Sequence, residues 1–583
     1  MQQRFAARDI QGLTPGIELT RSTELFVLDG SNYVFDSIGP YSGFSDRKLL
    51  PQPLGDPAFV QGVRLKLRDL DRSFVITTEQ IMEWDESFGG WRTLYITPST
   101  RNVGHRWTTG YVNGKQYFCH PLTGILVYDL LTGICQKLQG LGVPEDAIAI
   151  AADNGRLIAI TPELFMWSGQ SDGSDFDPRL GGAGFQIIAD WVSGDPILVT
   201  SYGQGTLTWT TGGVMRSEFT GDASVYRHRN LDTEYRPINS FCSVRVDEDT
   251  VVILDERGLF KSKGDAPEPY SPVFNEYLIG FLQDNAVTIG DNCRIEWDEL
   301  RRKLYVSISD TYASPLFETC FVLYPPMDKW GQFNESHYGI LPITIQSSQR
   351  EGRYFGYVDS IGCVRYWRKS GSREADSPEQ NSQLSLFYPQ ISQPAQYDHE
   401  SQFRIVGVNG VCNTIPSIDN PGRAGWYEID AVNPAPASLV GLNSVIRIGL
   451  WRIPTDQSVD ELTEITNVMI RSNESGPKSQ LSFDFNLLPD GGRDYNLTDG
   501  HQDYGLSPLN YVNHNLRLIG TIDGNTPFDI STPILDTFIQ GARYYTGGSI
   551  GLWHIIELSA VEVGESLHPR TVEITATYAG KLM

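Results

Sequence analysis

A strand-rich phrase recurs between residues 72 and 371 of this 583-residue chain. Each copy has a short apolar strand, a turn, a second strand with an aromatic residue, and a turn rich in Gly, Asp or Asn. One anchor residue was taken from the first strand of each copy: Phe74, Tyr117, Leu157, Ile197, Val251, Leu304 and Tyr354. These anchors lie 43, 40, 40, 54, 53 and 50 residues apart. A period of about 40–50 residues is the length of one four-stranded propeller blade, so the spacing predicts a β-propeller.

The number of anchors predicts about 6–7 blades. The segment GSNYVFDSIGP, residues 30–40, has the pattern of a strand without a hairpin partner nearby in the sequence. Propellers commonly complete one blade with strands from both chain ends. We therefore expect this N-terminal strand to close the ring.

A second domain is expected after the repeats, because 583 residues exceed the size at which one hydrophobic core stops growing, about 250–300 residues. The segment 369–383 is polar and carries Ser and Pro, as linkers do. Beyond it, alternating apolar and polar residues continue without the period. The sequence therefore predicts an all-β chain with a β-propeller at residues 1–375 and a β-sandwich-like C-terminal domain at residues 376–583.

The formal net charge of −25 excludes some partners. Such a surface repels nucleic acid and anionic membranes, which disfavours sequence-specific DNA binding. An acidic channel wall would let DNA slide past without sticking, although solubility alone is the simpler explanation. The sequence has no run of about 18 apolar residues and no signal-like apolar stretch at its start. The seven cysteines are dispersed, with no CxxC pair, and are expected to be reduced.

The sequence predicts no catalytic residue, no cofactor site and no metal site, and hence no enzyme. Phosphate-binding GxxxxGK[ST] loops and HExxH are absent, and no serine nucleophile elbow is expected. Oxygen-rich segments at 168–177 and 490–500 are the best calcium candidates, but neither follows the EF-hand order, and tight turns need the same residues. The acidic residues at 247–249 and the basic residues at 301–303 are expected on the surface. Six tryptophans recur at similar blade positions, which favours core packing: Trp84, Trp91, Trp167, Trp209, Trp330 and Trp367.

Several phrases resemble those of a known family, the tail nozzle proteins of short-tailed bacteriophages, also called tail hub or packaged-DNA stabilisation proteins. FMWSGQSDGSDFDP at 165–178 and VILDERGLFK at 252–261 resemble two of its blade segments. Residues 302–333 resemble its hairpin with the turn Asp328–Lys329–Trp330. The opening segment 16–44 and the terminal segment 550–580 are also similar to the family.

The resemblance implies a structural virion protein, assembled in the host cytoplasm as a homohexameric ring at the distal end of the phage tail. This ring would lie below portal and adaptor rings, retain packaged double-stranded DNA and conduct it during ejection. The C-terminal domain would join neighbouring copies or contact tail fibre or needle proteins. The alternative is a sialidase-like propeller hydrolase or a glycan-binding propeller, because segment 168–176 resembles an Asp-box turn. A generic protein-interaction propeller is a third reading.

Overall fold

The computed structural model describes most of residues 59–368, except 67–70, 86–89, 98–104, 181, 204, 222–224, 232–233, 285–292, 300, 310–315, 335, 347–350 and 360–363. Before residue 59 it describes 3–7, 10–13, 25–31, 33–35, 40–42 and 45–50. After residue 368 it describes 372–374, 383–388, 405–407, 410–412, 425–430, 439–441, 444–451, 461–472, 486–487, 493–494, 515–522, 526–539, 542–560 and 569–581.

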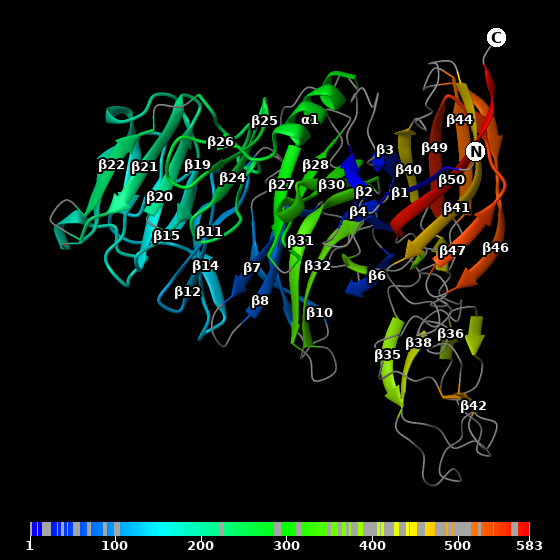
Figure 1. Cartoon of the computed structure of the whole chain (residues 1–583). Coiled ribbons are helices and arrows are strands. Elements are labelled where there is room, and N and C mark those ends of the chain that lie inside the picture. The colour runs from blue at the N-terminus through cyan, green and yellow to red at the C-terminus, as the bar shows by residue number, and fades with distance from the viewer. Residues whose placement is uncertain are drawn as a thin grey trace, which may run out of the picture. The chain divides into compact units, whose positions relative to one another are not determined.

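Packing divides the chain into two compact units (Figure 1). The propeller unit comprises residues 53–321 and 335–364, and the sandwich unit comprises residues 1–52, 322–334 and 365–583. Strands dominate the described part of both units, and the single α-helix described is α1 (Pro272–Asp284). The predicted all-β fold class is confirmed.

The repeats form a series of antiparallel sheets. The first five sheets have four strands each, in the orders β10-β9-β8-β7, β11-β12-β13-β14, β15-β16-β17-β18, β19-β20-β21-β22 and β23-β24-β25-β26. The sixth sheet runs β27-β28-β29-β30-β4-β5, and the seventh runs β31-β32-β33-β6. The predicted N-terminal strand is therefore present as β4 (Tyr33–Phe35), in the sixth sheet. The N-terminal strand β6 (Ser45–Leu50) is the fourth strand of the seventh sheet.

The bounds of these strands follow the repeat. They are β7 (Phe59–Lys66), β8 (Asp71–Thr77), β9 (Gln80–Asp85), β10 (Gly90–Ile96), β11 (Thr108–Val112), β12 (Lys115–His120), β13 (Gly124–Asp129), β14 (Ile134–Lys137), β15 (Ala149–Asp153), β16 (Arg156–Ile160), β17 (Leu164–Trp167), β18 (Gly184–Ile187), β19 (Pro196–Tyr202), β20 (Gly205–Thr210), β21 (Gly213–Phe219), β22 (Tyr226–Asn230), β23 (Ser243–Arg245), β24 (Val251–Asp255), β25 (Gly258–Ser262), β26 (Glu268–Pro269), β27 (Cys293–Asp298), β28 (Lys303–Ile308), β29 (Thr319–Tyr324), β30 (Lys329–Phe333), β31 (His337–Gln346), β32 (Glu351–Asp359), β33 (Val364–Arg368) and β5 (Pro40–Ser42).

The first strands of successive sheets pack against one another, as in a propeller. β11 contacts β15, which contacts β19, and the series continues through β23, β27 and β31. β31 also contacts β7, the first strand of the first sheet. The first strands therefore line the middle of the propeller unit, and the predicted β-propeller is confirmed.

Each of the seven anchor residues lies in a different sheet. The period in the sequence therefore corresponds to one sheet per repeat. Six anchors lie on the second strand of their sheet, whereas Ile197 lies on a first strand, β19. Leu207 on β20 is the position equivalent to the other anchors. With Ile197 as the anchor, the distances along the chain to the neighbouring anchors, Leu157 and Val251, are 40 and 54 residues. With Leu207 they are 50 and 44 residues. With equivalent second-strand positions, the repeats are therefore more evenly spaced than the sequence pattern predicts.

Asn-Gly dipeptides form two of the tight turns between first and second strands. Asn113 and Gly114 have φ values of 44° and 82°, and Asn154 and Gly155 have values of 46° and 71°. Two consecutive residues with positive φ are the requirement of a type I′ hairpin turn, which Asn-Gly meets at low steric cost. The local sequence thus determines the hairpin between β11 and β12 and the hairpin between β15 and β16.

Large aromatic side chains fill the interfaces between the sheets. Trp167, Trp209 and Trp330 are buried, as expected for core residues. Trp84 and Trp91 are partly buried and pack edge to face, with ring centroids 5.3 Å apart. The side chain of Trp367 lies outside the described residues. Core packing is confirmed for the three buried tryptophans.

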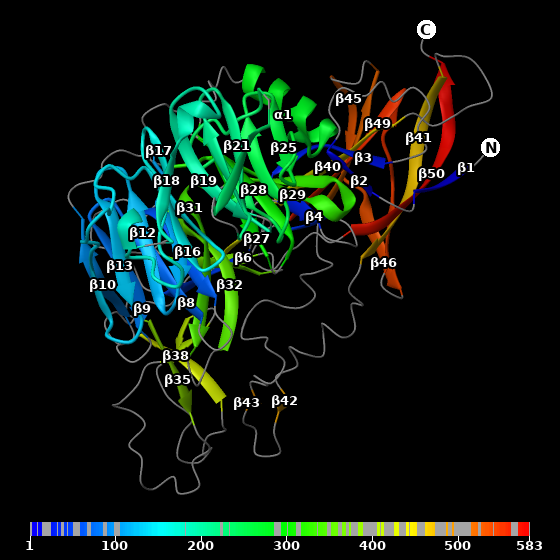
Figure 2. The ribbon, with the colours of Figure 1, turned by 90° about the vertical axis from the view of Figure 1, so that its left-hand side faces the viewer.

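Helix α1 lies beside β25 (Figure 2). Asn275, in its first turn, accepts a hydrogen bond from the Leu259 N–H (2.7 Å) and donates one to the Leu259 carbonyl (3.0 Å). Phe274 packs edge to face on Phe321, with ring centroids 5.8 Å apart. These contacts attach the helix to the propeller unit. No helix in the described part of the chain has the length and apolar character needed to cross a membrane.

The sandwich unit contains two larger sheets, which agrees with the predicted sandwich-like domain. One sheet runs β1-β50-β41-β47-β46, with β48 paired to β41, and the other runs β2-β3-β40-β49-β44-β45. His554 on β49 and Thr463 on β41 join the two sheets, with Nε2 and Oγ1 2.8 Å apart. The strands β1 to β3 come from the N-terminus, so the sandwich is built from both ends of the chain.

The remaining strands, all in the sandwich unit, have the following bounds: β1 (Gln3–Ala7), β2 (Ile10–Leu13), β3 (Leu25–Ser31), β34 (Ser372–Glu374), β35 (Gln383–Tyr388), β36 (Ile405–Gly407), β37 (Gly410–Cys412), β38 (Gly425–Asp430), β39 (Leu439–Gly441), β40 (Ser444–Trp451), β41 (Glu461–Ser472), β42 (Asn486–Leu487), β43 (Arg493–Asp494), β44 (Asn515–Thr521), β45 (Pro527–Ser531), β46 (Ile534–Ile539), β47 (Ala542–Thr546), β48 (Ile550–Gly551), β49 (Trp553–Ala560) and β50 (Pro569–Lys581).

Candidate functional site: the propeller centre and a pocket between two sheets

A buried arginine lies at the middle of the propeller unit. Arg294 is on β27, and its Nη1 donates a hydrogen bond of 2.5 Å to the carbonyl oxygen of Val60 on β7. The guanidinium lies against two aromatic rings, 4.0 Å from the Phe241 centroid and 5.0 Å from the Phe317 centroid. A planar guanidinium suits such a position, because it stacks on rings while its edge donates hydrogen bonds.

A second arginine holds the start of the fifth sheet. The backbone N–H of Arg106 donates to Ser240 Oγ (2.6 Å), and its Nη1 donates to the Ser243 carbonyl (2.7 Å). Its Nη2 lies 3.9 Å from Glu296 Oε2. Glu296 is two residues from Arg294 on the same strand, so the two side chains share one face of β27.

The charges of Arg106, Arg294 and Glu296 stabilise one another at this centre. Burial lowers the pKa of Arg294 to about 10, an effect that Glu296 opposes and Arg106 reinforces. Burial raises the pKa of Glu296, while both arginines oppose that rise. Arg294 therefore remains charged at neutral pH, and the Val60 carbonyl and the two rings surround it. The contacts of this centre connect the first, second, fifth and sixth sheets. We call the residues that make them the axial network: Val60, Arg106, Phe241, Arg294, Glu296 and Phe317.

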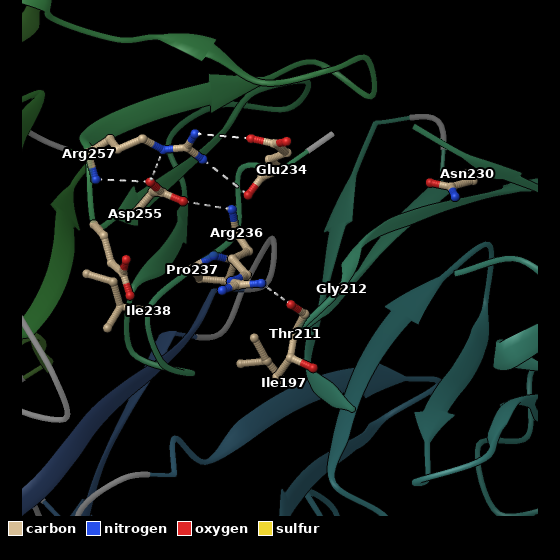
Figure 3. Close-up of a pocket in the computed structure, with 11 residues that line it drawn as sticks. Ile197, Thr211, Gly212, Asn230, Glu234, Arg236, Pro237, Ile238, Asp255 and Arg257 are labelled. Atoms are coloured by element: carbon tan, nitrogen blue, oxygen red, sulfur yellow. Dashed lines mark hydrogen bonds and ion pairs between the residues drawn. The ribbon is translucent and has the colours of Figure 1, made fainter. Parts of the chain in front are cut away.

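A pocket with a volume of about 830 Å³ lies between the fourth and fifth sheets (Figure 3). The β20–β21 turn, the segment joining β22 to β23 and the β24–β25 turn form its walls. The residues that line it are Ile197, Thr211, Gly212, Asn230, Glu234, Arg236, Pro237, Ile238, Asp255, Glu256 and Arg257. Its size is in the usual range for ligand pockets, about 300–1,000 Å³.

Asp255 organises one corner of this pocket. Its Oδ1 accepts hydrogen bonds from the Arg257 N–H (3.0 Å) and Nε (2.9 Å), and its Oδ2 accepts one from the Arg236 N–H (3.1 Å). Arg257 also contacts Glu234, donating to its carbonyl (3.2 Å) and lying 3.6 Å from its carboxylate. The Arg257 guanidinium stacks over the Tyr235 ring at 4.3 Å. The buried carboxylate therefore fixes both the turn and the backbone that carries Arg236 (Figure 3).

The Arg236 guanidinium reaches across the pocket to the fourth sheet. Its Nη1 donates a hydrogen bond to the Thr211 carbonyl (Figure 3). Within the described part of the chain, its Nε and Nη2 have no hydrogen-bond partner. These two N–H groups form one edge of the guanidinium, the edge that binds a carboxylate with two parallel hydrogen bonds.

The oxygen-rich segment 168–177 is a turn in the structure. Asp172 accepts a hydrogen bond from the Ser174 N–H (2.9 Å), and Asp175 accepts one from the Asp177 N–H (3.0 Å). Asp177 binds the Arg179 side chain through both oxygens, with contacts of 2.7–3.2 Å. These carboxylates serve the turn, and the described residues contain no cluster of His, Cys, Asp and Glu that could hold a metal ion. Of the second calcium candidate, 490–500, only Arg493 and Asp494 are described.

Two charged turns behave differently from each other. Asp247 accepts hydrogen bonds from the N–H groups of Asp249 (2.9 Å) and Thr250 (2.7 Å), which is consistent with an exposed turn. The basic segment 301–303 is less exposed than expected, because the Lys303 side chain is buried. Arg301 donates to buried Asp298 at 3.1 Å. The surface interpretation was therefore wrong for Lys303, where β28 begins within the sheet.

A GxSxG pattern, which suggests a serine nucleophile in some hydrolases, occurs at residues 547–551. In the structure it follows β47 of the sandwich unit directly and its last two residues form β48, with Ser549 buried. A nucleophile elbow joins a strand to a helix and exposes its serine, whereas this segment leads into a strand. The pattern therefore does not form a nucleophile elbow here.

Both the axial network and the Arg236 pocket were missed from sequence. Asp255 and Arg257 belong to the repeated segment 252–261, but nothing in that segment indicates Arg236 as a neighbour. The charges of Arg294 and Glu296 within the short strand CRIEWD were a usable signal, since charged residues rarely lie on a buried strand without partners.

The five cysteines whose side chains are described are free thiols, and all but Cys135 are buried.

Comparisons with known proteins give structural likenesses alone. No protein-family model matches the chain, and no curated protein matches it. Among solved structures, YCF48 bound to D1 peptide has 11% identity and a TM-score of 0.33, covering 56% of this chain and 95% of that chain. The extracellular domain of the putative one component system BT4673 from B. thetaiotaomicron has 13% identity and a TM-score of 0.36, covering 73% of this chain and 61% of that one. The domain of BT3049 from the same organism has 11% identity and a TM-score of 0.34, and this chain spans half of its length. Likenesses of this degree say nothing about function.

Proposed function

We propose that this chain is a structural virion protein that assembles with copies of itself into the distal tail nozzle of a short-tailed bacteriophage. In this role the ring retains packaged DNA and conducts it during ejection. The sequence support is the resemblance carried by segments 165–178, 252–261 and 302–333. Their described residues form strands and turns of the third, fifth and sixth sheets.

Exposed apolar residues on edge strands are the structural observation that most supports association of copies. Phe185 and Ile187 lie on β18, the last strand of the third sheet, and are 51% and 46% exposed. Phe528 and Ile530 lie on β45, the last strand of its sheet, and are 55% and 48% exposed. Alternation along a strand places each pair on one face. Such edges invite contact with another chain.

A contact between two different surfaces of identical copies generates a ring when the rotation closes. Copies that each carry a net charge of −25 repel one another, so their association needs apolar contacts of this kind. We expect the axial network to exclude DNA from the centre of a single propeller. The conduit in this proposal therefore lies between the copies of the ring.

Mass photometry and electron microscopy of the purified chain test the proposal. Six copies of the 65.1 kDa chain give a particle of about 391 kDa with six-fold symmetry. Phe185→Asp combined with Ile187→Asp should shift the protein to smaller species. Leu131→Asp, at a 95% exposed turn residue of the second sheet, is the matched control. A chain that stays monomeric at all concentrations, also with tail adaptor proteins present, contradicts the proposal.

A further inference from the structure

We propose that the pocket between the fourth and fifth sheets binds the carboxylate of an acidic peptide segment, with Arg236 as the residue that recognises it. Nothing in the ring proposal requires this site, and the site does not depend on that proposal. The inference rests on three features of the pocket: its volume, the fixed backbone at Arg236, and the difference in hydrogen bonding between its two arginines.

The two arginines of the pocket differ in availability. Arg257 already has carboxylate partners, since Asp255 binds its Nε at 2.9 Å and Glu234 lies 3.6 Å from its Nη1. Arg236 is held by a backbone carbonyl, that of Thr211, through Nη1 alone. In the described part of the chain, its Nε–Nη2 edge makes no hydrogen bond. A carboxylate placed there forms two parallel charge-assisted hydrogen bonds.

The backbone that carries Arg236 is preorganised. The buried Asp255 carboxylate accepts the Arg236 N–H at 3.1 Å, and Pro237, which follows, is also buried. The Nη1 bond to the Thr211 carbonyl then directs the guanidinium across the cavity (Figure 3). A side chain fixed in this way loses little freedom when a ligand binds.

The charge of the lining favours a single carboxylate over a phosphate. Three acidic residues, Glu234, Asp255 and Glu256, face two arginines in this pocket. The lining therefore has a net charge of −1, and an anion is attracted only locally, at the Nε–Nη2 edge of Arg236. A carboxylate with one negative charge meets less repulsion from the surrounding acidic residues than a phosphate dianion does. The volume of about 830 Å³ leaves room for a short peptide segment around the carboxylate.

Fluorescence anisotropy of a labelled, end-capped Ala-Ala-Glu-Ala-Ala peptide with the full chain tests the site. We expect the Glu peptide to bind and the matched Gln peptide to bind at least about tenfold more weakly, since charge-assisted bonds are worth about that factor. Acetate should compete better than inorganic phosphate. Equal binding of the two peptides, or stronger competition by phosphate, overturns the proposal.

Variants assign the binding to Arg236. Arg236→Gln should weaken Glu-peptide binding about tenfold or more, and Arg236→Lys should weaken it as well, because lysine lacks the two-pronged edge. Arg227→Gln, at an exposed position on β22, should leave binding unchanged. Glu234→Gln should tighten binding, since it removes a negative charge from a residue whose side chain is 93% exposed at the rim. Unchanged binding in Arg236→Gln, or weaker binding in Glu234→Gln, refutes the assignment.

Discussion

We expect two buried histidines to make the propeller unit less stable in mild acid. His120, on β12, accepts a hydrogen bond from the Leu122 N–H at Nδ1 (3.2 Å), which requires an unprotonated nitrogen. Burial lowers its pKa to about 4, and the neighbouring His105 adds to the effect. His228, on β22, has its Nδ1 2.9 Å from Ser217 Oγ and its ring 5.0 Å from Phe165. Burial lowers its pKa to about 4 as well.

The sign and size of the effect follow from linkage. Between pH 6.5 and pH 4 the unfolded chain binds a proton at each histidine that the folded chain does not, so stability falls as the pH falls through this window. The shift of about 2.5 units corresponds to a maximum of about 3.4 kcal/mol per histidine. Between pH 7 and pH 5.5 the loss is about 1.2 kcal/mol each, or about 2.5 kcal/mol for both.

His554 of the sandwich unit, whose pKa burial lowers to about 3, causes a loss of stability in the same window, so the two units must be measured separately. Carboxylates whose pKa values are lowered in the fold affect stability mainly below about pH 5. Glu296, with a raised pKa, contributes stability that is greatest in acid and decreases as the pH rises. An acid-induced loss between pH 7 and pH 5.5 that is confined to the propeller unit is therefore the effect expected of His120 and His228.

Chemical denaturation followed by tryptophan fluorescence, with hydrogen exchange to separate the units, measures this loss. The wild-type chain should lose free energy of unfolding between pH 7 and pH 5.5. In the double variant His120→Asn/His228→Asn this loss should be smaller by about 2.5 kcal/mol. The double variant will be less stable at neutral pH, so the comparison concerns the pH dependence. The reasoning fails if the wild-type propeller unit is equally stable at both pH values, or if the variant keeps the full pH dependence.

Three further variants test the packing and the ion pairs of the propeller unit. Gly62→Ala should lower the melting temperature, because a Cβ at this position would lie 2.3 Å from Leu341 Cβ, and overpacking costs about 1–3 kcal/mol. Gly280→Ala, in α1 with open space around it, should raise the melting temperature by removing a helical glycine. A higher melting temperature for Gly62→Ala than for Gly280→Ala contradicts the structure. Glu83→Gln should cost about 2 kcal/mol in chemical denaturation, less than a fully buried pair, because its partners Arg72 and Arg92, both at 2.6 Å, are partly exposed. An unchanged free energy of unfolding would show that Glu83 is not the counter-ion of the first sheet.

The fold was predictable from sequence because its determinants are local. Alternating apolar residues, Asn-Gly turns such as Asn113–Gly114, and the recurring aromatics all act within one hairpin, so the repeat is visible without any knowledge of the neighbours. Strand partners from the distant N-terminus were only partly predictable. The segment 30–40 had the pattern of a strand, whereas nothing in the sequence marked β1 to β3 as members of the sandwich sheets.

The sites were less predictable because they depend on contacts between remote residues. Arg236 meets Thr211 across two sheets, and Arg294 meets Val60 on the first sheet. Neither residue belongs to a spaced motif. Their roles come from the packing of successive sheets, which places turns and first strands together in a way that spacing alone does not specify.

The bond between Arg294 and Val60 also affects the order in which the protein folds. These residues are 234 positions apart, and Arg106 and Ser243 are 137 apart. Contacts of long sequence separation form late, since a large loop must close before they contribute. A nascent chain that has not yet reached Arg294 lacks the guanidinium that fills the middle of the first sheets. We therefore expect those sheets to mature only after the sixth sheet has left the ribosome, and chains truncated before residue 294 to aggregate.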